Sequence, residues 1–318
     1  MKGFISPGIH PLYKFLILLA FMAGGICVGM FVVMLGLSLF YGFSLADITT
    51  VTQNPSAFPN GKSAMVFYQV ATHFFMFTAA PLVFLVMSEP SVKRYLFQKK
   101  NYLGLILLSA VLALLIMPAN SWLINWNAKM VLPEALKGFE AWAKQKEELL
   151  AELTKYLTQF DTVGQMLMGL VAFALVPAIG EELVFRGIVQ RNFGTWFKNH
   201  HVAIWITAFI FGAIHVQFYG FFPRMLLGAL FGYLYFWSKN LWVPIAAHFM
   251  NNGFTVFLLY LQQNKVVNAD IESTDAMPWH FGLISLLLSL AVLFYLRKQF
   301  LTIPAEREVT PEENLKLT

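Results

Sequence analysis

The sequence predicts an all-α fold, a polytopic membrane helical bundle of about eight transmembrane helices with one amphipathic loop helix. Two features of the composition lead to this class. Hydrophobic residues make up 58% of the 318-residue chain and charged residues only 12%, whereas a soluble domain averages about 25% charged residues. The apolar residues also come in long uninterrupted blocks, which is the pattern of segments that cross a bilayer.

Eight apolar blocks are candidate transmembrane helices. A transmembrane helix needs about 20 mostly apolar residues, and the fifth and sixth blocks are the shortest. An even number of spans places both chain termini on the same side of the membrane. The blocks are residues 15–43, 64–87, 102–124, 162–190, 202–218, 222–238, 241–262 and 279–296.

The lysines and arginines indicate which side that is. Fourteen of the 22 basic residues fall on the side of the termini, so the positive-inside rule places both termini in the cytoplasm. The net charge of +5 is interpreted in the same way, and no nucleic-acid partner is expected. The single cysteine, Cys27, excludes an intramolecular disulfide. The first apolar block is too long for the core of a cleavable signal peptide, so it is expected to remain as a span.

The loop before the fourth span carries apolar residues at helical spacing between Pro133 and Leu157, with lysines and glutamates between them. This pattern predicts an amphipathic helix on the extracytoplasmic side. Such a helix could lie on the outer leaflet and guide a substrate, or it could pack over the bundle as a lid or brace. We favour the brace.

We treat the chain as one integrated domain with four portions. Residues 1–130 are accessory transmembrane helices, and residues 131–160 contain the amphipathic loop helix. Residues 161–300 form the transmembrane core, which is expected to be the working portion, and residues 301–318 form a disordered cytoplasmic tail.

The fourth span carries two adjacent acids, Glu181 and Glu182, followed by Arg186. Carboxylates in a membrane are costly and are commonly retained for function. Glu182 and Arg186 are four residues apart and can pair on one helix face, whereas Glu181 is turned away by about 100° and is free to act as a base. Pro177 removes one backbone hydrogen bond and clashes with the Phe173 carbonyl, which predicts a kink just before the acids. The competing interpretation is a helix end with ordinary surface charges.

Two further spans make that competing interpretation less attractive. His215 follows Phe211 by four residues, and Asn252 follows His248 by four, so each pair shares a helix face. Imidazole, carboxamide and carboxylate groups in three spans are suitable groups for a hydrolytic site. An isolated histidine in an apolar helix is more often a packing residue, and we interpret His73 in the second span in that way.

The three motifs Glu181-Glu182-x-x-x-Arg186, Phe211-x-x-x-His215 and His248-x-x-x-Asn252 resemble those of the CPBP intramembrane proteases, also called Abi. This family includes the CAAX prenyl endopeptidases and bacteriocin-immunity and bacteriocin-processing proteins. The resemblance covers about residues 160–262, and the flanking sequences are also similar. Residues 1–130 and the loop helix carry no matching motif.

The resemblance implies hydrolysis of a peptide bond in a membrane-associated protein or peptide. Glu181 and His215 would activate the attacking water, while His248 and Asn252 would stabilise the oxyanion. Glu182, Arg186 and Phe211 would support them. The implied location is the bacterial inner membrane, and the implied partners are the lipid bilayer and the substrate.

Two questions stay open at this point. Glu181, His215, His248 and Asn252 could instead bind Zn²⁺, but the spacing does not match H-E-x-x-H, and we prefer a glutamate-type protease without a cofactor. The same buried residues could also serve a proton-coupled transporter or a catalytically idle protein that binds a partner. No inverted repeat supports the transporter.

Overall fold

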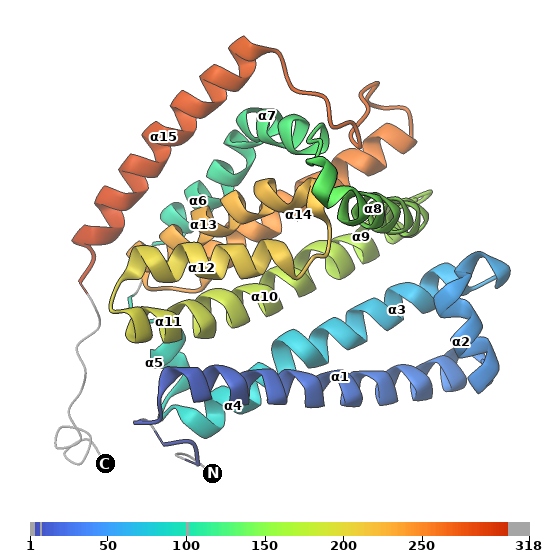
Figure 1. Cartoon of the computed structure of the whole chain (residues 1–318), viewed down its shortest axis with the longest axis horizontal. Coiled ribbons are helices and arrows are strands. Elements are labelled where there is room, and N and C mark those ends of the chain that lie inside the picture. Colours follow the sequence, from blue (N-terminus) through green and yellow to red (C-terminus); the bar gives the residue numbers. More distant parts are fainter. Residues whose placement is uncertain (1–3, 7, 100–101, 305–318) are drawn as a thin grey trace.

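The computed structural model describes residues 4–6, 8–99 and 102–304 (Figure 1). Within these ranges the chain is helical and forms no strand, apart from one isolated bridge between Phe97 and Asn240. The predicted all-α class is therefore confirmed. The α-helices are α1 (Pro11–Tyr41), α2 (Leu45–Gln53), α3 (Gly61–His73), α4 (Ala80–Ser88), α5 (Val92–Leu96), α6 (Leu103–Leu115), α7 (Met117–Ala128), α8 (Lys137–Leu157), α9 (Val163–Gly169), α10 (Val176–Glu182), α11 (Gln190–Phe197), α12 (His200–Ala213), α13 (Phe221–Ser238), α14 (Trp242–Gln263) and α15 (Trp279–Thr302).

Short irregular helices connect several of these elements. Three are π-helical turns inside longer helices, namely η2 (Phe74–Ala79), η4 (Leu170–Leu175) and η5 (Leu183–Val189). Three are 3-10 turns in loops, namely η1 (Pro55–Ala57), η3 (Glu134–Leu136) and η6 (Phe218–Gly220).

Helices occupy all eight predicted span positions, but the count of eight transmembrane helices is not confirmed. In the described part of the chain, four helices are long and apolar enough to cross a membrane, or five if the pair α6 and α7, bent by 42°, is one span. Helix α12 has 14 residues and reaches about 21 Å at 1.5 Å per residue, less than the hydrocarbon core of about 30 Å. Helices α13 and α14 carry the polar residues of the site described below, which lower their mean hydropathy.

The fourth predicted span is one long helix, Val163–Phe197, which includes two π-helical turns. Thr162 caps its start by accepting a hydrogen bond from the Gln165 amide at 3.2 Å, as its position predicts. Gly194 could end this helix as a C-cap, but the helix continues past it for another turn in which Phe193 and Phe197 pack together, and it ends at Lys198 in the left-handed conformation, with φ of 51°. At the predicted kink the structure has a π-helical turn, η4, just before Pro177.

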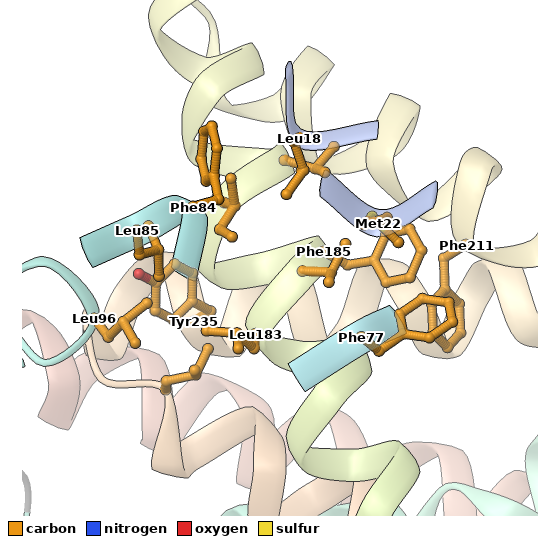
Figure 2. Close-up of a cluster of buried hydrophobic side chains, with 14 of the residues drawn as sticks. Leu18, Met22, Phe77, Phe84, Leu85, Leu96, Leu183, Phe185, Phe211 and Tyr235 are labelled. Carbon is orange, nitrogen blue, oxygen red and sulfur yellow. The ribbon is translucent and has the colours of Figure 1, made fainter. Parts of the chain in front are cut away.

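A buried hydrophobic cluster joins the first helices to this long helix (Figure 2). Leu18 and Met22 of α1 and Phe84 of α4 lie in the same cluster as Leu183 and Phe185. Helices α1 and α3 also run side by side in Figure 1 and contact each other. The accessory helices therefore pack directly on the turn of the long helix that follows the acid pair.

The remaining elements agree with the predictions in part. Helix α8 lies at the predicted amphipathic loop, whereas α2 was not predicted because its nine residues are too short for a clear period. The start of α1 and the end of α15 lie on the same side of the bundle in Figure 1. Helix α15 runs to Thr302, and residues 305–318 of the predicted tail lie outside the described residues.

Candidate active site

The acid pair and the arginine are buried in the bundle. Glu182 and Arg186 have no exposed surface, and Glu181 is 9% exposed. The interpretation of these residues as surface charges at a helix end is therefore wrong. The long helix is held here by a core on one side and by α13 and α14 on the other.

Glu182 is the centre of a buried network. Its Oε1 accepts hydrogen bonds from Arg186 Nη1 at 2.7 Å and from His248 Nδ1 at 2.8 Å. Arg186 Nη2 donates to the Gly228 carbonyl at 2.8 Å, and its guanidinium lies over the Phe211 ring at 4.7 Å. A buried ion pair is tolerated when further hydrogen bonds and good contacts accompany it. The pairing that the i,i+4 spacing predicts is thus extended to two other helices.

Gly228 allows the close approach that this network requires. A Cβ atom at Gly228 would lie 3.2 Å from Phe211 Cδ1 and 3.3 Å from Ala208 Cα. Helices α12 and α13 therefore touch through the backbone at this point. The small-xxx-small spacing from Gly228 to Gly232 allows this close packing, and it also brings the Gly228 carbonyl within reach of Arg186.

His248 is oriented by its neighbours. A carboxylate can only accept, so the ring donates from Nδ1 to Glu182. Phe231 stacks on the imidazole at 5.3 Å with an interplanar angle of 20°. The second nitrogen, Nε2, then faces Asn252 Nδ2 at 3.2 Å and Glu181 Oε2 at 3.9 Å. The network thus turns a defined ring nitrogen of His248 toward Glu181.

Asn252 is oriented by the proline in the neighbouring helix. Its Nδ2 donates to the Phe173 carbonyl at 3.2 Å. Pro177 has no N–H, so it cannot occupy that carbonyl as an ordinary residue four positions later would. The Phe173 carbonyl, which receives no hydrogen bond from Pro177, thus orients the Asn252 carboxamide of α14.

His215 lies just beyond the end of α12. Its Nδ1 is 2.7 Å from the Phe211 carbonyl, to which it must donate. In the neutral ring Nε2 is then an acceptor. The next residue, Val216, has φ of 54°, which is unusual for a β-branched side chain and is typical of strain at functional sites. Glu181 and His215 interact electrostatically, so a carboxylate and the ring acceptor of the half-buried His215 lie in one region of the bundle.

The structure adds two residues that the sequence reasoning missed. His73, interpreted as packing, has its Nε2 3.2 Å from Glu181 Oε1. Arg224 donates to Gln217 at 2.6 Å and interacts electrostatically with Glu147 and Glu181. For Arg224 the signal was present, because an arginine among apolar residues near a span end is costly. For His73 no local signal existed.

Helix α8 lies against the loop that follows His215. Glu147 accepts from the Tyr219 amide at 3.3 Å, and the rings of Phe139 and Phe218 are 5.5 Å apart. These contacts agree with a brace over the site.

The four predicted metal ligands do not fit a zinc ion in this arrangement. Among residues 4–6, 8–99 and 102–304, no three His, Cys, Asp or Glu side chains are grouped closely enough to hold a metal ion. Asn252 also turns its amide nitrogen, not its oxygen, toward His248 Nε2. We therefore assign no chemical step to a metal.

Comparison with known proteins connects this region to a family. Residues 163–254 match the family described as type II CAAX prenyl endopeptidase Rce1-like. YdiL of Bacillus subtilis (strain 168), which is named as a membrane peptidase, is 32% identical over 100 residues, or 31% of this chain and 40% of YdiL. The membrane-embedded CAAX protease MroQ of Staphylococcus aureus (strain USA300) is 29% identical over 102 residues, or 30% of this chain and 41% of MroQ.

A third relative, YpbD of Bacillus subtilis (strain 168), is 31% identical over 85 residues, or 26% of this chain and 40% of YpbD. The chain thus spans about two fifths of the length of the curated relatives it matches. No solved structure matches it significantly. The matched region contains all three motifs but excludes His73.

Proposed function

We propose, from the match of residues 163–254 to the Rce1-like family and from the geometry of the site, that the chain is an intramembrane endopeptidase of the CPBP type. Its substrate would be a membrane-associated protein or peptide, and the bilayer would be its other partner. The observation that carries this proposal is the state of Glu181. This buried carboxylate has one oxygen held by His73, while the other faces His248 and interacts with no closer donor among the described residues.

The proposed reaction begins with a water molecule between Glu181 and His215. Glu181 removes a proton as the water oxygen attacks the scissile carbonyl carbon. His215 Nε2 accepts a hydrogen bond from the second O–H of the water and so orients it. The carbonyl oxygen becomes an oxyanion. As the carbon–nitrogen bond breaks, Glu181 returns its proton to the leaving amine nitrogen, so that the carboxylate is regenerated.

Asn252 and His248 are the proposed oxyanion donors. Asn252 Nδ2 would exchange its bond to His248 for one to the oxyanion, while the Phe173 carbonyl keeps the amide in place. His248 can donate from Nε2 only when both ring nitrogens carry protons, because Glu182 already takes the Nδ1 proton. Donors held close to the developing charge stabilise it, and here the Phe173 carbonyl and Glu182 hold Asn252 and His248 in place.

The proposed setting is the bacterial inner membrane with both termini in the cytoplasm. The distribution of the lysine and arginine side chains between the two sides supports this orientation through the positive-inside rule. Water must reach Glu181 through a cavity, since hydrolysis consumes it.

The proposed function is tested by comparing the N-termini of membrane proteins in cells that produce wild type or Glu181→Gln. We expect new N-termini only with wild type, and their positions would give the substrate and cleavage preference together. If both strains have the same N-termini and the purified wild type conducts protons in liposomes, the protein is a transporter.

We also expect the purified protein to keep its full rate after treatment with EDTA or 1,10-phenanthroline. A glutamate-type site needs no metal to lower the pKa of the attacking water. The rate of peptide cleavage before and after chelation is the measurement. A loss that added Zn²⁺ restores would show a metalloprotease.

A further inference from the structure

We infer that His73 is a positioning residue for Glu181, which makes the accessory helices part of the site. This inference rests on the proposed function. It extends the site beyond residues 163–254, because His73 ends α3 and lies 108 positions before Glu181 in the chain.

The first observation is the geometry of the pair. His73 Nε2 is 3.2 Å from Glu181 Oε1, and a carboxylate only accepts, so Nε2–H donates. The two side chains are largely buried, with 17% and 11% exposed. The ring is held in place by Phe77, which stacks on it at 4.6 Å with an interplanar angle of 20°.

The second observation is the glycine beside Glu181. A Cβ atom at Gly180 would lie 2.9 Å from Phe77 Cβ, 2.9 Å from Thr78 Oγ1 and 3.1 Å from His73 Cε1. The helix that carries His73 therefore reaches the acid only because residue 180 has no side chain. Close packing of two membrane helices through small residues is common, but here the approach delivers a donor to the proposed base.

The third observation concerns what Glu181 would do without this donor. The last side-chain torsion of a glutamate is broad and roughly two-fold. The carboxylate of Glu181 can therefore rotate even though the helix fixes its backbone. The bond to Oε1 fixes its plane and leaves Oε2 on the side of His248, at 3.9 Å from Nε2. His73 thus selects which oxygen receives the proton of water. His73 Nδ1 is buried and has no hydrogen-bond partner among the described residues, so the ring makes its polar contact through Nε2.

The test uses three substitutions that separate positioning from packing. His73→Gln places an amide nitrogen near the position of Nε2, His73→Asn places one near Nδ1, and His73→Leu keeps apolar volume without a donor. The probe is a quenched-fluorescence peptide that spans a cleavage site found in the N-terminal comparison. His280→Leu, on exposed α15, is the matched control.

We expect His73→Leu and His73→Asn to lower kcat about 10- to 100-fold with little change in KM, as loss of an orienting partner does. His73→Gln should keep most of kcat. In the Glu181→Gln background, His73→Leu should cause no further loss, because both changes act on one group.

The inference is overturned if His73→Leu folds and keeps the wild-type kcat, or if Gln and Asn at position 73 give equal rates. If His73→Leu does not fold, the comparison of the Gln and Asn variants decides. An active Glu181→Gln enzyme would instead contradict the proposed function, so the two failures are distinguishable.

Discussion

Glu181→Gln is expected to lower kcat/KM for peptide cleavage by about 10²- to 10⁴-fold, the usual contribution of a positioned general base. The amide matches the carboxylate in shape and can still accept from His73, but it cannot take a proton from water. Folding should therefore be unchanged. The rate is measured with the purified protein in detergent or in liposomes, together with its melting temperature.

Glu89→Gln is the matched control for this substitution. Glu89 follows α4, and its Oε1 lies 3.9 Å from Lys14 Nζ rather than near any residue of the site. Its substitution should therefore leave the rate of peptide cleavage unchanged. If Glu181→Gln cleaves as fast as wild type, Glu181 is not the base and the mechanism proposed above is wrong.

Arg186→Met is expected to destabilise the protein by about 3–5 kcal/mol, because it leaves the fully buried Glu182 without its cation. The guanidinium also bonds the Gly228 carbonyl and lies over two phenylalanine rings, so contacts with two other helices, α12 and α13, are lost together. Thermal or denaturant unfolding in detergent measures this cost.

The double variant Glu182→Leu and Arg186→Met distinguishes two causes of lost stability, an unpaired buried charge and a loss of packing. Replacing both members of a buried pair by apolar residues is often neutral or stabilising, so most of the stability should return. Activity should not return, because His248 Nδ1 then has no carboxylate to accept its hydrogen bond and orient the ring. A double variant as unstable as Arg186→Met alone would show that packing of the arginine, and not the unpaired charge, decides stability.

Local sequence spacing predicted those parts of the site that lie within one helix. The i,i+4 relation of Glu182 to Arg186 and the vacancy at the Phe173 carbonyl follow from helix geometry and from the missing N–H of Pro177. What spacing could not predict is the partner on another helix. The contacts of Asn252 with Phe173 and of His248 with Glu182 depend on how α14 is placed against the long helix.

His73 shows this limit most clearly. Nothing near it in sequence is charged or polar enough to indicate a partner, and its partner is 108 residues away. The interpretation as a packing residue is the usual one for an isolated histidine, and spacing could not show that the close approach at Gly180 brings His73 to Glu181. The number of spans was uncertain for a different reason, since α12 is short and α13 and α14 carry polar residues.

The π-helical turn η4 has a consequence for insertions and deletions in this chain. Such a turn holds one residue more than an α-helical path of the same length needs, so the residues beyond it lie about 100° from where they would lie if the whole segment were α-helical. Deleting a single residue from Leu170–Leu175 would let this turn become α-helical while Thr162 on one side and the acid pair on the other keep their relative phase. A deletion in the α-helical stretch Val163–Gly169 would instead turn Thr162 by about 100° relative to Glu181 and Glu182. The π-helical turn is therefore a place where this helix can lose a residue without reorienting its acid pair.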